Sequence, residues 1–163
     1  MEDQSIKIPP EQIFQRVKTL VESGEYNSAF TLLEVFEQYK EERHKEWKYP
    51  TPGLILSYRG LCMARGKKNY KQGLDMCLKA SGMEFAYPDC YMNLGRLLLD
   101  KGRRMEAMKA FTQAQSIDPK SVPLKREIAN MGVRKPPVFP FLSRGNFLNR
   151  FFGKLRASGK KKE

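Results

Sequence analysis

The residue types that most often carry catalysis or bind metals are few in this sequence and poorly placed for it. His44 is the single histidine, and it lies between two basic residues without an acidic or cysteine partner beside it. The three cysteines, Cys62, Cys77 and Cys90, lack the spacing of a metal site or a redox pair. We therefore expect no metal, no cofactor and no enzyme activity.

One glycine-containing stretch could be taken for a phosphate-binding loop. Gly60 and Gly66 are followed by Lys67 and Lys68, but the loop is one residue too long and lacks the Ser or Thr that binds magnesium. The zinc-protease, Cys-x-x-Cys and Gly-x-Ser-x-Gly sequences are absent as well. Function is therefore expected to come from binding surfaces.

Charge is the strongest compositional signal. The chain of 163 residues has a net charge of +12, and residues 122–163 contribute 11 basic and 2 acidic groups, a net of +9. Such asymmetry favours an acidic partner, such as nucleic acid, anionic lipid or an acidic protein. No apolar run approaches the roughly 20 residues of a membrane-spanning helix. The first residues lack the features of a signal peptide, so we expect a cytoplasmic protein.

Two apolar helical stripes follow one another between residues 88 and 121. Gly95 and Ala107 have almost no side chain, so the two helices can cross closely, and Phe111 can fill the space beside the crossing. Gly102 between the stripes permits a tight turn. The stripes consist of Tyr91, Leu94, Gly95 and Leu98, and of Ala107, Phe111 and Ala114.

This pattern, closed by Pro119, resembles the tetratricopeptide repeat (TPR). Every position of the family pattern is met except the second aromatic, where Leu98 stands. Weaker copies precede it, the first of them separated by about ten extra residues between positions 41 and 52. The copies are carried by Tyr58, Gly60, Tyr70, Gly73, Cys77 and Ala80, and by Tyr26, Ala29 and Leu33.

The resemblance implies an all-α fold, a TPR-type helical repeat solenoid of three helix pairs closed by a C-terminal capping helix. A TPR domain over residues 10–132 would then precede a basic tail, residues 133–163. Stacked repeats of this kind leave an extended concave face. The repeats are expected at about 10–43, 53–87 and 88–121, with the capping helix at 122–131.

TPR proteins bind peptide segments or protein domains in a groove lined by the first helix of each repeat. The resemblance therefore implies a non-catalytic adaptor or scaffold with a protein or peptide partner. The positions expected to line the groove hold Phe14, Lys18, Ser57, Leu61, Met92 and Arg96. Some members clamp a C-terminal carboxylate there with polar and basic side chains. Phe14, Ser57 and Met92 depart from that set, which disfavours the tails of heat-shock chaperones, although Asn93 and Arg96 remain.

The tail has two parts. Three prolines between residues 136 and 140 favour an extended segment, because proline fixes φ and biases its predecessor away from the helical region. A basic amphipathic helix is expected to follow. Its apolar residues are Phe147, Leu148, Phe151, Phe152 and Leu155, and its basic residues are Arg150, Lys154 and Arg156.

Several interpretations of this helix stay open. It could dock on the repeats and compete with a partner, lie on an anionic membrane surface, bind a partner protein, contact nucleic acid, or pair two protomers. The alternative to an adaptor is thus a peripheral membrane or ribonucleoprotein component held by its tail. The contacts are expected from Phe147, Arg150, Phe151 and Lys154.

Overall fold

The computed structural model describes residues 9–42, 49–132, 138, 139, 142 and 146–158. His44 and most of the Pro-rich segment therefore lie outside the described residues. The chain divides into two compact units, Met1–Ile128 and Ala129–Glu163, and each is treated by itself.

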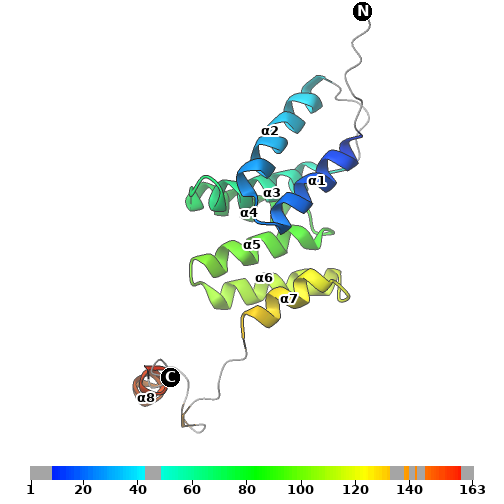
Figure 1. Cartoon of the computed structure of the whole chain (residues 1–163). Helices are drawn as coiled ribbons and strands as arrows, with labels where there is room; N and C mark the ends of the chain where they lie inside the picture. The colour runs from blue at the N-terminus through cyan, green and yellow to red at the C-terminus, as the bar shows by residue number, and fades with distance from the viewer. Residues whose placement is uncertain (1–8, 43–48, 133–137, 140–141, 143–145, 159–163) are drawn as a thin grey trace, which may run out of the picture. The chain divides into compact units, whose positions relative to one another are not determined.

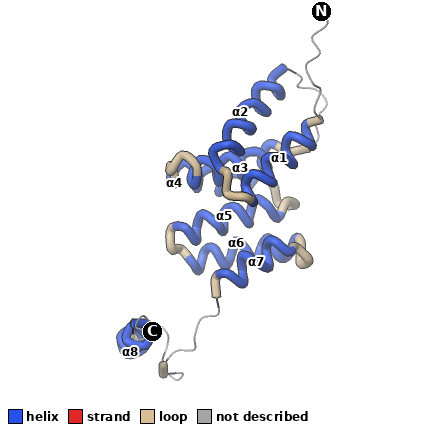
Figure 2. The backbone as a smooth tube through the Cα atoms, viewed as in Figure 1, coloured by secondary structure: helices blue, strands red, loops and turns tan. Residues whose placement is uncertain are grey.

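The first unit consists of three helix pairs followed by most of one further helix, as the repeat pattern predicts (Figures 1 and 2). Every regular element in the described part of the chain is a helix, which confirms the all-α prediction. The pairs are α1 (Pro10–Glu22) with α2 (Tyr26–Glu42), α3 (Pro52–Arg65) with α4 (Tyr70–Met83), and α5 (Pro88–Asp100) with α6 (Arg104–Ile117); α7 covers Val122–Asn130.

Proline and side-chain caps fix the starts of several helices. Pro10, Pro52 and Pro88 each begin the first helix of a pair, where the missing N–H costs nothing. The Thr51 hydroxyl accepts a hydrogen bond from the N–H of Leu54 at the start of α3. The helix starts are thus encoded locally.

Each hairpin turn contains one residue with a positive φ. Gly24 and Gly102 take this conformation in the first and third pairs, at 84° and 72°. In the second pair the residue is Lys68, at 61°. Only glycine adopts this region without cost, so the middle turn holds a backbone strain that its two counterparts avoid.

The two helices of a pair cross where a side chain is absent. A methyl group added to Gly95 would overlap the ring of Phe111, and one added to Gly60 would lie 2.7 Å from the carbonyl oxygen of Gly73. Phe111 and Ala107 are fully buried. The expected close crossing, with Phe111 packed beside it, is therefore present.

The first pair departs from the regular stack. In Figure 1, α1 and α2 run obliquely to the direction of α3–α6. Helix α2 has 17 residues, against 14 in each of α4 and α6. The extra residues before α3 thus coincide with a longer helix and a tilted pair.

The second unit contains α8 (Phe147–Ser158), the helix expected in the tail. Its Asn149 side chain is buried, with 7% exposed, and binds the main chain ahead of the helix. The Asn149 amide oxygen accepts from the N–H of Phe139 at 2.8 Å. Its amide nitrogen donates to the carbonyl oxygens of Phe139 and Leu142, each at 3.0 Å. This clasp holds residues of the preceding segment against α8.

Candidate functional site

The six predicted groove residues lie on α1, α3 and α5, the first helices of the three pairs. The structure brings these helices together, but it buries most of the six side chains. Lys18 alone is partly exposed, and the others are at most 7% exposed: Phe14, Ser57, Leu61, Met92 and Arg96. Their role as partner contacts stays a prediction.

We call the surface formed by α1, α3 and α5 the inner face. An ion pair crosses it directly. The Lys18 ammonium lies 2.8 Å from a carboxylate oxygen of Asp89, which joins α1 to α5. The same ammonium lies 5.7 Å and 5.9 Å from the ring centroids of Phe14 and Tyr58. Burial lowers the pKa of Lys18, but the hydrogen bond and charge of Asp89 outweigh it and raise the pKa. A partner carboxylate would therefore compete with Asp89 for Lys18.

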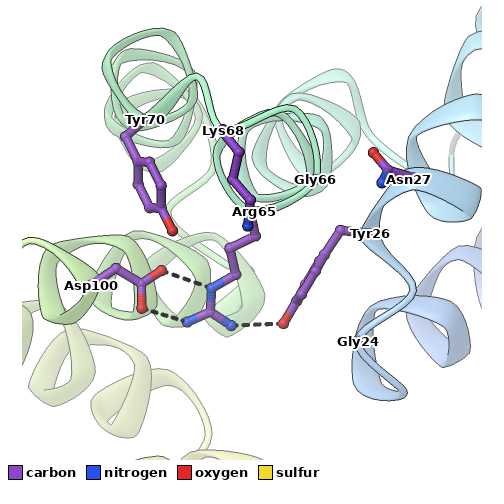
Figure 3. Close-up of a pocket in the computed structure, with 8 residues that line it drawn as sticks. All are labelled: Gly24, Tyr26, Asn27, Arg65, Gly66, Lys68, Tyr70 and Asp100. Carbon is purple, nitrogen blue, oxygen red and sulfur yellow. Dashed lines mark hydrogen bonds and ion pairs between the residues drawn. The ribbon is translucent and has the colours of Figure 1, made fainter.

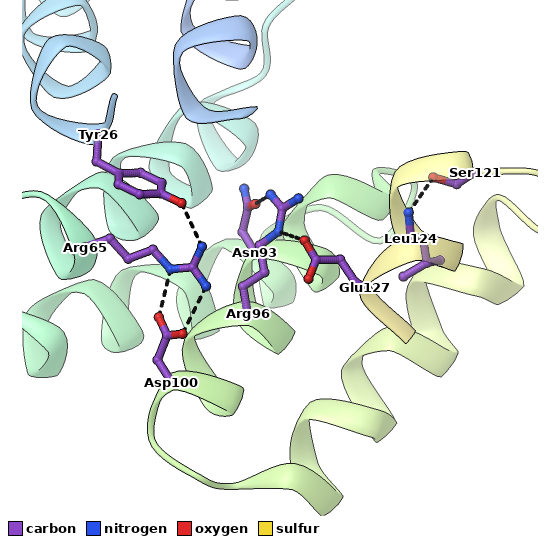
Figure 4. Close-up of polar contacts among 8 residues, drawn as sticks. All are labelled: Tyr26, Arg65, Asn93, Arg96, Asp100, Ser121, Leu124 and Glu127. Carbon is purple, nitrogen blue, oxygen red and sulfur yellow. Dashed lines mark hydrogen bonds and ion pairs between the residues drawn. The ribbon is translucent and has the colours of Figure 1, made fainter. Parts of the chain in front are cut away.

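A chain of polar contacts continues across α3, α5 and α7. The Asn93 amide donates to the hydroxyl of Ser57 at 3.1 Å, and Arg96 donates to the amide oxygen of Asn93 at 3.2 Å. Arg96 also pairs with Glu127 of α7 at 2.7 Å (Figure 4). These polar groups are mutually satisfied, so they connect the helices and fasten α7 to the stack.

A pocket of about 530 Å³ opens at the edge where the hairpin turns of the three pairs meet (Figure 3). We call it the turn-edge pocket. All three helix pairs contribute to it, and its volume lies in the range of small-ligand sites. It is lined by Gly24, Tyr26, Asn27, Arg65, Gly66, Lys68, Tyr70 and Asp100.

Arg65 stands at the centre of this pocket. Its Nε and Nη2 lie 2.8 Å and 3.0 Å from the two carboxylate oxygens of Asp100, and its Nη1 donates to the Tyr26 hydroxyl at 2.8 Å (Figures 3 and 4). Burial lowers the pKa of Arg65, but these hydrogen bonds outweigh it and raise the pKa. Since Asp100 neutralises the guanidinium, the charge available to a ligand comes from other cations.

Those cations come from the turns themselves. Lys68 lines the pocket, and the Lys101 ammonium lies 4.3 Å from the ring centroid of Tyr70, another lining residue. Lys67 lies 5.3 Å from the ring centroid of Phe30. Within the described part of the chain, none of these three lysines has a carboxylate partner at ion-pair distance. The pocket rim is therefore positive.

Sequence reasoning missed this pocket because it treated the turns only as connections. The signal that could have found it is the recurrence of Lys and Arg in two successive turns. The run Gly66-Lys67-Lys68, set aside above as a phosphate loop, supplies part of that rim.

The three cysteines are buried, and their thiols are poor candidates for chemistry. Burial raises the pKa of Cys62 and of Cys90 to about 12, and raises that of Cys77 as well. The Cys77 thiol donates to the carbonyl oxygen of Ser57 at 3.3 Å. No three potential metal ligands gather among the residues that the structure describes. Likewise, no described helix has the length and apolar character needed to cross a bilayer.

Comparison with known proteins places the fold. Residues 88–121 match the family profile described as tetratricopeptide repeat. No curated protein matches the chain significantly in sequence. Among solved structures, a chain in the structure of Naa15/Naa10 bound to HypK-THB has a TM-score of 0.59 and 19% identity, covering 74% of this chain. This chain corresponds to only 16% of the length of that one.

The first TPR of Spaghetti (RPAP3), bound to the HSP90 peptide SRMEEVD, has a TM-score of 0.50 and 15% identity, covering 78% of this chain and 95% of that chain. The Yersinia enterocolitica type III secretion chaperone SycD, with a peptide of the translocator YopD, has a TM-score of 0.47 and 18% identity; the match covers 74% of this chain and 84% of that one. With the profile match at the third helix pair and the same helix-pair build in the other two, this chain has the tetratricopeptide repeat fold.

Proposed function

We propose that the chain is a non-catalytic protein-interaction module that binds an extended, acidic segment of a partner protein. The TPR fold supports this function, and the first TPR of Spaghetti (RPAP3) is itself bound to a peptide in its structure. The proposal concerns this chain alone, since the match covers only 16% of the neighbouring chain in the Naa15/Naa10 structure.

The turn-edge pocket is the observation that carries the proposal. It is open, it takes residues from all three helix pairs, and its rim is positive. Lys68, at the rim, keeps a backbone conformation that costs free energy in a lysine. Such strain tends to persist at functional sites, where the surrounding structure holds it. A carboxylate of the partner would meet Lys68 and Lys101 there.

The inner face is the second candidate binding surface, and it includes the six predicted groove residues. In this structure the Lys18–Asp89 pair bridges it, and its α3 and α5 positions are buried. Binding there would first require an opening that separates the Lys18–Asp89 pair and exposes those side chains. The turn-edge pocket needs no such opening, so we place the primary contact at the pocket.

Site-specific photo-crosslinking tests the location. A photoreactive amino acid would replace Asn27 at the pocket, Lys18 on the inner face, or Lys109 on the exposed side of α6, each in the full chain. We expect one protein to be captured from Asn27 and not from Lys109. Capture from Lys18 alone would assign the binding to the inner face, and equal capture from all three would reject a defined site.

Charge reversal tests the chemistry of the contact. The double change Lys68→Glu and Lys101→Glu should abolish capture, because the rim then repels an acidic segment. Lys79→Glu is the matched control, since Lys79 is exposed on α4 and does not line the pocket. Capture that survives the double change would contradict the acidic partner.

Competition by the tail is a further prediction from the sequence. If the tail docks on the repeats, only the undocked fraction binds the partner. Removal of residues 136–163 should then tighten partner binding. An unchanged affinity would exclude competition.

A further inference from the structure

The C-terminal unit presents an apolar surface that its own contacts leave uncovered. Phe147 is 73% exposed, Phe151 48%, Leu148 42% and Phe152 41%. The rings of Phe147 and Phe151 stack with centroids 6.0 Å apart, and Phe152 meets Phe151 edge-on at 5.4 Å. Four neighbouring exposed large side chains on one short helix form the kind of patch that marks a binding surface.

The clasp around Asn149 accounts for the side of α8 that is covered. Asn149 binds the main chain of Phe139 and Leu142, and the Phe139 ring meets Phe152 edge-on at 5.7 Å. These contacts use one side of the helix. The side that carries Phe147 and Phe151 is left open, so the apolar surface is held in place by the fold of the unit itself.

The charge of the segment is entirely positive. Between Arg144 and Lys162 there are seven basic residues and no acidic residue. Arg150 is exposed on α8. In the sequence, Lys154 follows Arg150 at the helical spacing of four residues. An apolar stripe with cations at its flank is complementary to a surface that is apolar within and anionic outside.

We propose that α8 binds the surface of an anionic lipid bilayer, lying in its plane with the Phe147–Phe151 face inserted and the basic residues among the headgroups. This is the geometry of interfacial amphipathic helices, which need the apolar face and the cations together. The proposal is independent of the proposed partner at the turn-edge pocket, because α8 lies in the other unit.

Nucleic acid fits this surface less well. Single-stranded binding uses aromatic faces that are free to stack on bases. Here the faces of Phe147 and Phe151 are turned toward each other, with an interplanar angle of 21°. The rings therefore form one apolar surface instead of separate stacking platforms.

Vesicle flotation of the full chain tests the proposal. We expect binding to phosphatidylcholine vesicles that contain phosphatidylserine, and at least tenfold weaker binding to phosphatidylcholine alone. High salt should weaken the binding to the anionic vesicles, because it screens the attraction of the cations to the headgroups. Equal binding to both vesicles, or binding to neither, would overturn the proposal.

Two double variants separate the apolar and the ionic contributions. Phe147→Glu with Phe151→Glu should abolish vesicle binding, and Arg150→Glu with Lys154→Glu should weaken it at least tenfold. Met105→Glu with Met108→Glu is the matched control, because these exposed side chains lie on α6. All three should keep the helical circular dichroism and thermal unfolding of the repeats. Loss of binding in the Met control as well would overturn the assignment to α8.

The other occupants give distinct results. One such result is binding of a single-stranded RNA oligonucleotide that requires Phe147 and Phe151 and that vesicles do not displace. It would assign this surface to nucleic acid. A dimer in light scattering that becomes monomeric in the Phe147→Glu, Phe151→Glu variant would assign it to a second copy of the chain. Either result would overturn the lipid assignment.

Discussion

Lys18 of the first helix pair and Asp89 of the third form a direct ion pair, with 2.8 Å between Nζ and Oδ2, although 71 residues separate them. The pair therefore bypasses the middle repeat. It links α1 to α5 across the inner face.

A double-mutant cycle measures the strength of this pair. Lys18→Met and Asp89→Asn should each destabilise the fold, and their coupling should be about 1–2 kcal/mol, because both side chains are about three-quarters buried. Urea unfolding gives the four free energies. The exposed Arg103–Glu106 pair is the control and should show smaller coupling. Additive effects of the two changes would mean that the ion pair contributes nothing.

At the crossing of α5 and α6, two substitutions should cause opposite packing defects. Phe111→Ala leaves a cavity and should lower the free energy of unfolding by about 3–5 kcal/mol. Gly95→Ala overfills the same place and should cost about 1–3 kcal/mol, because the new methyl group overlaps the Phe111 ring.

The same crossing offers a rescue test. Gly95→Ala combined with Phe111→Leu should recover part of the loss, since a smaller side chain makes room for the methyl group. Gly82 is the control, because a Cβ there meets nothing within 4 Å. If Gly82→Ala destabilises the fold as much as Gly95→Ala, the close crossing is not the cause.

Lys68 predicts a stabilising substitution. Lys68→Gly should raise the free energy of unfolding by up to about 1 kcal/mol, because glycine adopts the positive φ without strain. Lys67→Gly, next to it in the same turn, should bring no gain. The Lys68→Gly protein should also bind the acidic partner more weakly, since the rim loses a cation. If Lys68→Gly stabilises the fold but does not weaken partner binding, the backbone strain at Lys68 has no part in binding.

The buried thiols predict loss of stability in alkali. Cys62 and Cys90 have pKa values of about 12 in the fold, and that of Cys77 is also raised, whereas an unfolded thiol ionises near about 8.5. Above that pH the unfolded state releases thiol protons that the folded state keeps, so the free energy of unfolding falls as pH rises. Each thiol contributes about 1.4 kcal/mol per pH unit.

Urea unfolding between pH 8 and pH 10, under reducing conditions, checks this slope. Cys62→Ala removes one thiol and should reduce the slope by about one third, whatever its effect on stability at pH 7. An unchanged slope in that variant would show that ionisation of other groups drives the alkaline loss.

The repeat architecture could be predicted because its determinants are local. Gly95, Ala107 and Phe111 meet within one helix pair, and residue size alone fixes how closely those helices cross. Prolines at the helix starts and the glycine in the third hairpin turn are likewise visible in the sequence. The same pattern placed α8, since its apolar residues recur at helical spacing.

The ion pairs and the pocket could not be predicted in this way. The chain has 30 basic and 18 acidic residues, and nothing in the sequence selects Asp89 for Lys18 or Asp100 for Arg65. Which charges meet depends on how the helix pairs stack in three dimensions. The same stacking decides the exposure of the inner face, so the positions of Ser57, Leu61 and Met92 were predictable while their burial was not.

In a stack of repeats, each repeat normally contacts only its neighbours, and stability is a sum of repeat terms and interface terms. Arg65 belongs to the middle pair, yet it holds Tyr26 of the pair before it and Asp100 of the pair after it. One guanidinium group therefore contributes to both interface terms. Its loss would weaken the coupling of the middle pair to both neighbours at once, so the thermal unfolding transition should become broader.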